Sequence, residues 1–318
     1  MSRLAIVVAV TACASAPRSP GLVLADPVEV IAASPSDGFW FPYVLYVPTG
    51  SAGKTDLLVE PNNTGTTNDD FDVHLRSAIV TAEGSTNSIG HFVAREAGLP
   101  LLVPAFPRPA ALPLVYTHAL DRDTMLVDHP PLRRLDLQLV AMIDDARRRL
   151  AGRQILVGER VLLTGFSASA AFVNRFTFLH PELVRGVAAG ALGVPMLPIA
   201  ELDGRTLDYP LGVHDYGAFT GTSFAAARLR EIPQFVYVGE LDENDPVQSD
   251  DAFSETERET VYAVLGRKKF PDRWERCHEI YERAGMNATF KAYAGIGHGT
   301  NRAINLDVAA FFRRLTRL

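Results

Sequence analysis

Short apolar runs alternate with segments of helical periodicity along most of this 318-residue chain. The apolar runs are YVLYVP, DLLVEP, LPLLVPAF, RVLLTGF, VRGVAAGA, QFVYVGE and TFKAYAGI. Several are apolar nearly throughout rather than at alternate positions, which is typical of strands covered on both faces. The alternation therefore predicts an α/β fold with a mostly parallel central sheet and helices on both faces.

Two of the intervening segments carry an apolar stripe at helical spacing. The stripes consist of Leu135, Leu139, Ile143, Ala146 and Leu150, and of Ile304, Val308, Phe311, Phe312 and Leu315. Each stripe predicts an amphipathic helix that packs on the sheet.

Composition excludes some classes of function. The net charge of −6 argues against a nucleic-acid partner, because phosphate binding needs a basic surface. No stretch approaches the roughly 18 apolar residues of a membrane span. With 47% hydrophobic residues, the chain has enough apolar side chains for a sizeable globular core.

The N-terminus, MSRLAIVVAVTAC, has a basic residue, a short apolar run and then small residues before Cys13. This pattern is typical of an export signal, and VTAC resembles a bacterial lipobox, in which the cysteine is lipidated. We expect residues 1–22 to be a leader and tether. We also expect the protein to be exported, with Cys13 as a possible site of a lipid anchor. The alternative is a first strand in a chain that stays in the cytoplasm.

Residues 23–318 are expected to form a single domain, because no linker or internal repeat divides them. Two long irregular insertions interrupt the strand–helix rhythm, at about 107–132 and 194–225. Both follow predicted strands, at the end where α/β folds bind ligands. Long insertions of this kind are usually functional loops or lids.

The segment VLLTGFSASAAF places Ser167 between a buried strand and a helix. A nucleophile in such a turn needs small residues two positions before and after it, and Gly165 and Ser169 meet that need. The common pattern is G-x-S-x-G, so the serine at 169 is a departure. Ser169 itself would lie inside the helix, and Ser223 in GTSFA has no apolar strand before it. We therefore expect Ser167 to be the nucleophile.

A serine nucleophile needs a base and an acid that orients the base. Asp242 and Asp245 follow the strand QFVYVGE, and His298 follows the last strand, between two glycines. The chain order is serine, acid, histidine, with each residue after a successive strand, as in one common hydrolase arrangement.

On these segments the chain resembles the α/β-hydrolase fold family, nearest to its bacterial serine esterase and depolymerase-like branch, over roughly residues 40 to 318. The resemblance implies a triad of Ser167 as nucleophile, His298 as general base and Asp242 as orienting acid. Asp242 matches the G-x-x-D turn of the family in GELD. Asp245 is the alternative acid.

The oxyanion formed on attack needs hydrogen-bond donors. The first expected donor is the backbone N–H of Ala168, the residue after the nucleophile. Many relatives carry His-Gly after an earlier strand, but this chain has PNNTG, so Asn63 or Thr64 is the expected second donor.

Side chains in the insertions and beside the nucleophile are expected to bind the substrate. They are Phe166, Tyr116, His118, Tyr209 and Tyr216. His118 has a second interpretation, as a hydrogen-bonded anchor of its loop. No histidine spacing suggests a metal site, and the predicted chemistry needs no cofactor.

The predicted activity is hydrolysis of a small or polymeric carboxylic ester through an acyl-enzyme. A peptidase or amidase, or an acyltransferase, would use the same three residues. A non-catalytic binding protein with this fold is the alternative from a different class.

Overall fold

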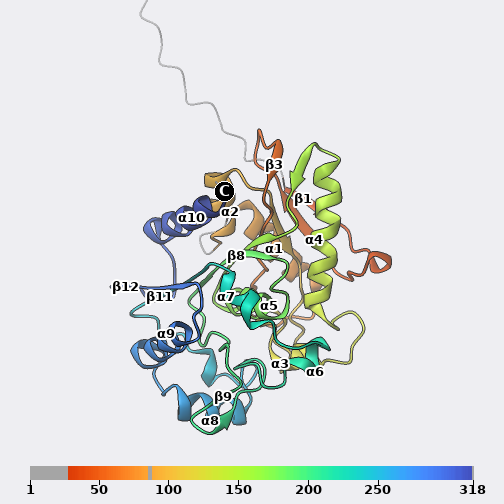
Figure 1. The fold of residues 1–318 in the computed structure, drawn as a ribbon. Coiled ribbons are helices and arrows are strands. Elements are labelled where there is room, and N and C mark those ends of the chain that lie inside the picture. Colours follow the sequence, from red (N-terminus) through yellow and green to blue (C-terminus); the bar gives the residue numbers. More distant parts are fainter. Residues whose placement is uncertain (1–27, 85–87, 317–318) are drawn as a thin grey trace, which may run out of the picture.

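A computed structural model describes residues 28–84 and 88–316 of the chain. Its centre is an eight-stranded sheet (Figure 1). In spatial order the strands are β1 (Val28–Ile31), β2 (Tyr43–Tyr46), β5 (Leu101–Pro104), β4 (Leu58–Val59), β7 (Val161–Phe166), β8 (Val184–Gly190), β11 (Gln234–Gly239) and β12 (Ala288–Tyr293). β2 is antiparallel to both β1 and β5, and all other neighbours are parallel.

The predicted mostly parallel sheet is thus confirmed, and each apolar run of the sequence contributes a strand to it. The edge strand β1 was not predicted, because VEVI is short and its middle residues are only partly covered. A separate parallel pair, β3 (Gly53–Thr55) with β6 (Ile155–Val157), also lies outside the predicted set. The predicted leader and Cys13 lie outside the described residues.

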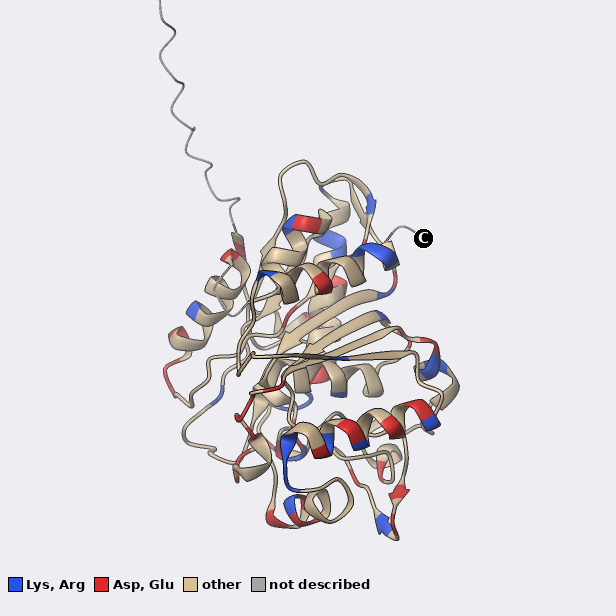
Figure 2. Ribbon diagram, turned by 90° about the vertical axis from the view of Figure 1, so that its left-hand side faces the viewer, with Lys and Arg blue, Asp and Glu red and all other residues tan. Residues whose placement is uncertain are grey.

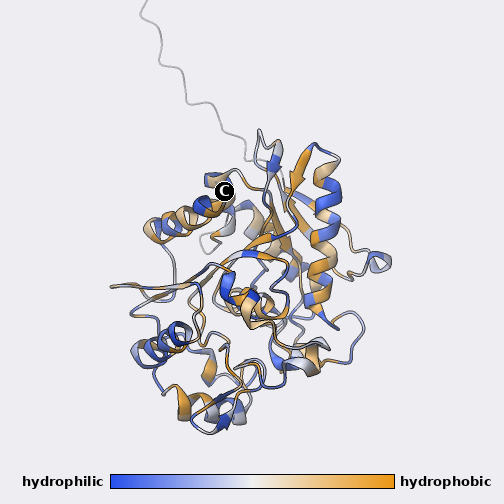
Figure 3. Ribbon diagram, in the orientation of Figure 1, coloured by the Kyte–Doolittle hydropathy of each residue, from blue (hydrophilic) through white to orange (hydrophobic). Residues whose placement is uncertain are grey.

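Helices cover both faces of the sheet (Figure 1). One face packs against α4 (Leu135–Ala151), α5 (Ala168–Leu179) and α9 (Trp274–Arg283), and α8 (Glu255–Val264) contributes Val261 and Val264 to the same core. The other packs against α1 (Phe71–Glu83), α2 (Gly90–Ala97) and α10 (Arg302–Thr316). Both predicted apolar stripes belong to these helices, on α4 and α10. Figure 3 shows hydrophobic strands beside helices of mixed character.

The strands are apolar at successive positions because each face of the sheet has its own core. In β7, Leu163 belongs to the core on the α4 side, whereas its neighbour Leu162 belongs to the core on the α10 side. Successive strand residues point to opposite faces, so only a sheet covered on both sides buries them all. Charged residues lie mainly on the helices and loops (Figure 2).

The segments expected as insertions contain short elements only. Residues 107–132 include a helical turn at Thr117–Ala119 and α3 (Arg122–Leu126). Residues 194–225 include the hairpin of β9 (Glu201–Leu202) and β10 (Arg205–Thr206), followed by α6 (Tyr216–Thr220), and α7 (Ala226–Glu231) comes next. The two segments contact each other: the Arg122 guanidinium donates hydrogen bonds to the Asp215 carboxylate over 2.6 Å and to the Tyr209 carbonyl over 2.8 Å.

Within the described ranges, no helix combines the length and the apolar character needed to cross a bilayer.

Candidate active site

A cavity of about 530 Å³ opens at the carboxyl ends of the parallel strands. Its wall comes from the loops after β4, β5, β7, β8 and β11, from one face of the helix after β7, from Thr81 and Ser88, and from His298, which follows β12. The carboxyl ends of parallel strands meet at one edge of a sheet, and α/β proteins bind their ligands there. Ser167 and His298 both line this cavity.

Ser167 occupies a sharp turn between β7 and α5. Its backbone has φ 60° and ψ −122°, a conformation that is costly for any residue with a Cβ. Its N–H donates to the Gly190 carbonyl over 2.8 Å, which ties the turn to the end of β8. The surrounding structure therefore holds the serine in a strained conformation at the mouth of the sheet.

Two small residues allow this turn. A Cβ on Gly165 would lie 2.3 Å from the backbone oxygen of Ser169, so the crossing of strand and helix requires glycine at 165. The Ser169 hydroxyl lies 3.0 Å from both the N–H and the carbonyl of Phe166. Ser169 therefore binds the strand end, which explains how a serine fills the place of the usual second glycine.

Asp242 and His298 are in direct contact. The Nδ1 atom of His298 lies 3.0 Å and 3.1 Å from the two carboxylate oxygens of Asp242. The turn after β11 approaches the histidine loop closely, since a Cβ on Gly239 would lie 2.2 Å from the Ile296 carbonyl oxygen. With Nδ1 facing the carboxylate, the Nε2 atom of His298 is left for another partner.

Asp245 has different partners. It forms an ion pair of 2.5 Å with the buried Arg273 and accepts a hydrogen bond from the Val247 N–H over 3.2 Å. Of the two aspartates left open by the sequence, Asp242 is therefore the one that contacts His298.

A buried lysine also binds Asp242. The Nζ atom of Lys269 donates hydrogen bonds to Asp242 Oδ2 over 2.8 Å, to the Asn244 carbonyl over 2.8 Å and to the Ala191 carbonyl over 3.3 Å. Burial by itself raises the pKa of Asp242, but the hydrogen bonds from His298 and Lys269 outweigh it and hold that pKa below its ordinary value. Asp242 is therefore ionised at neutral pH.

Ser167 and His298 share the cavity without being bonded to each other. Among the residues that the structure describes, the Ser167 hydroxyl has no hydrogen-bond partner. The ring of His298 packs on Phe166, with 5.1 Å between ring centroids. Hydrogen bonds of catalytic groups are often long without substrate and tighten in the complex.

The expected oxyanion donors Ala168, Asn63 and Thr64 all line the cavity. Ala168 is the first residue of α5, where helix N–H groups have no partner within the helix. Asn63 Oδ1 accepts a hydrogen bond from the Gly65 N–H over 3.2 Å, and Thr64 Oγ1 lies 2.8 Å from His74 Nδ1. The candidate second donors are therefore the backbone N–H groups of both residues and the Nδ2 amide of Asn63.

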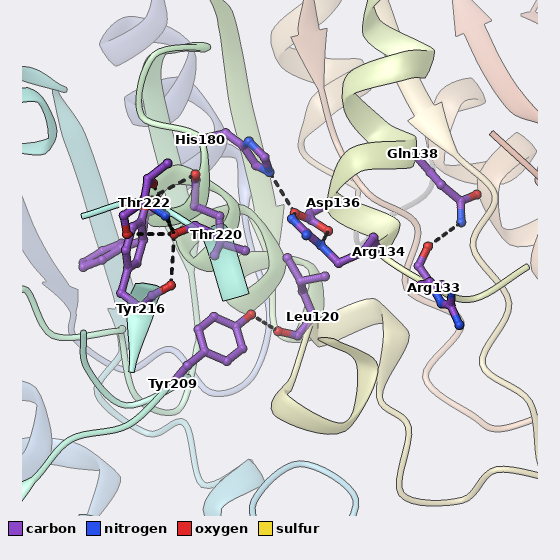
Figure 4. Close-up of polar contacts among 12 residues, drawn as sticks. Leu120, Arg133, Arg134, Asp136, Gln138, His180, Tyr209, Tyr216, Thr220 and Thr222 are labelled. Atoms are coloured by element: carbon purple, nitrogen blue, oxygen red, sulfur yellow. Dashed lines mark hydrogen bonds and ion pairs between the residues drawn. The ribbon is translucent and has the colours of Figure 1, made fainter. Parts of the chain in front are cut away.

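Among the expected substrate-binding residues, Phe166 and Tyr116 line the cavity. Tyr209 and Tyr216 do not, which corrects the sequence interpretation. The Tyr209 hydroxyl donates to the Leu120 carbonyl, and the Tyr216 hydroxyl donates 3.2 Å to the Phe178 carbonyl. Figure 4 shows the Tyr209 hydroxyl at the Leu120 carbonyl, a contact between the two insertions, and Tyr216 beside Thr220 and Thr222. Their aromatic rings are core side chains.

His118 is also outside the cavity wall, and its interpretation as a loop anchor fits the structure. It is buried, and its Nε2 atom donates to the Phe106 carbonyl over 2.9 Å. Burial lowers the pKa of His118 to about 3, so the imidazole is neutral. Its ring lies behind Thr64, with 3.4 Å between Thr64 Oγ1 and Nδ1.

Three cationic residues of the site were missed by sequence reasoning. Arg108 and Arg175 line the cavity, and Lys269 binds Asp242. Arg175 had a signal, because it is the one charged residue of the apolar helix segment ASAAFVNRFTFL. Lys269 had none, since it lies in a loop far along the chain from the acid that it contacts.

No family model matches the sequence, and no curated protein matches it either. Several solved structures, in contrast, match this chain. Poly(aspartic acid) hydrolase-1 from Sphingomonas sp. KT-1 matches with a TM-score of 0.60 and 17% identity, over 93% of this chain and 100% of that one. An arylesterase matches with a TM-score of 0.52 and 12% identity, over 94% and 86% of the two chains.

A third similar structure is brefeldin A esterase, a bacterial homologue of human hormone-sensitive lipase. It matches with a TM-score of 0.50 and 14% identity, over 95% of this chain and 81% of that one. At such identities the likeness concerns the fold alone. Together with the mostly parallel sheet and its flanking helices, it shows that this chain has the α/β-hydrolase fold.

Proposed function

We propose that this protein is a serine hydrolase that cleaves a carboxylic ester through an acyl-enzyme. The observation that carries the proposal is the contact between His298 Nδ1 and the Asp242 carboxylate in the wall of the cavity that also holds Ser167. This is the arrangement of base and orienting acid that serine nucleophiles require.

In the first half of the reaction, Ser167 Oγ attacks the ester carbonyl carbon while its proton passes to His298 Nε2. Asp242 holds Nδ1 and stabilises the imidazolium that forms. The negative charge on the carbonyl oxygen is stabilised by the backbone N–H of Ala168 and by an N–H group of Asn63 or Thr64. The C–O bond then breaks, and the histidine returns the proton to the departing alcohol.

In the second half, water takes the place of the alcohol. His298 removes a proton from the water as its oxygen attacks the acyl carbon, and then returns that proton to Ser167 Oγ as the serine ester breaks. The products are a carboxylic acid and the regenerated enzyme.

The test is labelling with a fluorophosphonate probe followed by peptide mass spectrometry. The expected adduct is on Ser167, and the Ser167→Ala variant should neither be labelled nor hydrolyse p-nitrophenyl butyrate. Ser169→Ala is the matched control and should still be labelled. An adduct on Ser169 or Ser223, or no adduct, would overturn the proposal.

The same assay separates the related activities. Comparing p-nitrophenyl butyrate with the anilide of butyric acid measures ester against amide cleavage. Added methanol measures transfer against hydrolysis. An ester hydrolase should favour the ester and release free butyrate as its main product.

A further inference from the structure

One face of α5 forms part of the cavity wall. Ala168, Ala171 and Arg175 all line the cavity, at positions three and four residues apart, which share a face of a helix. The two alanines leave space beside Ser167. The arginine stands at the far end of that space, about two helical turns from the serine.

Arg175 is buried and has almost no protein partner for its charge. It is 3% exposed, and its Nη1 atom donates to the Ala119 carbonyl over 2.8 Å. Within residues 28–84 and 88–316, no carboxylate forms an ion pair with it, and its Nε and Nη2 atoms make no hydrogen bond. Neither nitrogen is fully sealed from solvent, and the residue lines the cavity.

The nearby carboxylates are engaged in other contacts. Asp251 lines the cavity in an ion pair with Arg108. Glu60 also lines it, but burial raises the pKa of Glu60 to about 7 and suppresses much of its charge. Asp121 is not in the wall and accepts backbone hydrogen bonds of 3.1 Å and 3.0 Å; burial raises its pKa to about 7, although the nearby charge of Arg175 lowers that pKa in part. The charge of Arg175 is therefore left without a counter-ion in the cavity.

A buried guanidinium is costly unless an anion or polar groups satisfy it. Its planar arrangement of N–H groups matches a carboxylate, which it can bind through two parallel hydrogen bonds. We infer that Arg175 is a binding site for a carboxylate of the substrate, so that the preferred substrate is an anionic ester. The inference rests on the proposed function, since it places the ester carbonyl at Ser167.

The helix sets the distance between the two ends of the substrate. Ser167 and Arg175 are eight positions apart, and an arginine side chain on a helix leans toward the N-terminus, so the carboxylate would lie roughly 6 to 10 Å from the reacting carbonyl. This span corresponds to a chain of a few carbon atoms. The wall also includes Phe253, whose ring centroid lies 5.8 Å from the Arg175 guanidinium carbon.

The first experiment compares charged and capped esters. In one arm the carboxylate is on the acyl side: the mono-p-nitrophenyl esters of succinic, glutaric and adipic acid are compared with the same compounds carrying a methyl ester at the free end. In the other arm it is on the alcohol side: 4-butyryloxybenzoate is compared with its methyl ester. In at least one arm, kcat/KM should be about 10- to 100-fold higher for the anion.

Variants connect this preference to Arg175. Arg175→Met keeps most of the apolar stem and removes the charge, and it should reduce the ratio of anionic to neutral kcat/KM by about 10- to 100-fold. Arg175→Lys keeps a charge without the planar fork and should give an intermediate ratio. The matched control is Arg122→Met, since Arg122 pairs with Asp215 outside the cavity wall and its loss should leave the ratio unchanged.

A binding measurement needs no catalysis. Glutarate should raise the thermal midpoint of Ser167→Ala but not of the Ser167→Ala, Arg175→Met double variant. Ser167-dependent hydrolysis without any preference for an anion in either arm would overturn the carboxylate site and leave the proposed function standing. If no ester is hydrolysed, the proposed function fails, and the glutarate measurement alone tests the carboxylate site. A rise in the thermal midpoint that requires Arg175 supports the site, and no such rise overturns it.

Discussion

Lys269 donates a 2.8 Å hydrogen bond to Asp242 Oδ2, while His298 Nδ1 lies 3.0 Å from Oδ1 of the same carboxylate. The aspartate is thus shared between a buried ammonium and the imidazole. In a triad with an aspartate alone, the whole negative charge stabilises the imidazolium. Here the lysine takes part of that charge and fixes the carboxylate in place.

Replacing Lys269 with methionine should therefore shift the pH–rate profile. Without the ammonium, the full charge of Asp242 favours the imidazolium, so the acidic limb of kcat/KM should move to higher pH. Removing one partner of a buried ion pair should also lower the free energy of unfolding by about 3 kcal/mol. Both effects are measured with p-nitrophenyl butyrate across pH and with urea unfolding.

The neighbouring residue supplies the control. Lys268 is exposed, so Lys268→Met should change neither the profile nor the stability beyond a few tenths of a kcal/mol. An unchanged acidic limb in a folded Lys269→Met protein would mean that the lysine acts on the stability of the loop alone.

The two aspartates should separate activity from stability. Asp242→Asn leaves the carboxamide beside His298 in the wrong hydrogen-bonding state and should lower kcat by roughly 1,000- to 10,000-fold. Asp245→Asn removes the charge opposite Arg273, whose side chain is 1% exposed, and should lower the free energy of unfolding by about 3 kcal/mol with a much smaller loss of kcat. The reverse pattern would make Asp245 the orienting acid.

The fold could be predicted from the sequence because both faces of the sheet are covered. Strands such as RVLLTGF are then apolar at every position, and the helices between them carry clear stripes. The edge strand Val28–Ile31 was missed for the opposite reason: it is only partly covered and carries the exposed Val30.

The candidate site could be predicted where the backbone conformation requires a particular residue type at a particular position in the sequence. Gly165 marks the strained turn at Ser167, and the glycines beside His298 mark its loop. Partners brought together only by tertiary packing leave no such mark, as with Lys269 and Asp242. The tyrosines at 209 and 216 misled because aromatic rings in an irregular segment suit a pocket and a core equally well; here both hydroxyls bind buried carbonyls.

Strain at the nucleophile gives a stability prediction. Ser167 has φ 60° and ψ −122°, which glycine adopts far more easily than alanine. Ser167→Gly should therefore be more stable than Ser167→Ala by about 1 kcal/mol, after allowing for the larger entropy of glycine in the unfolded chain. Both variants lack the hydroxyl, so the difference in stability between them does not include its loss. Differential scanning calorimetry measures it, and equal or reversed midpoints would argue against strain at this turn.

Glu60 gives a prediction for the pH dependence of stability. Its carboxylate accepts hydrogen bonds from the Ser88 hydroxyl over 2.7 Å and the Gly90 N–H over 2.9 Å, yet burial raises its pKa from 4.5 to about 7. A group whose pKa is higher in the folded state stabilises the fold while it is protonated. That contribution is complete below about pH 4.5 and is lost as the pH rises to about 7.

Relative to Glu60→Gln, the wild-type protein should therefore lose on the order of 3 kcal/mol of unfolding free energy over this range and then stay level. The difference between the two proteins isolates Glu60, because every other titrating group, including the buried Asp121, is common to both. Urea unfolding at a series of pH values measures that difference. A constant difference from pH 4 to pH 8 would show that the pKa of Glu60 is the same in the folded and unfolded states, because the hydrogen bonds from Ser88 and Gly90 offset the effect of burial.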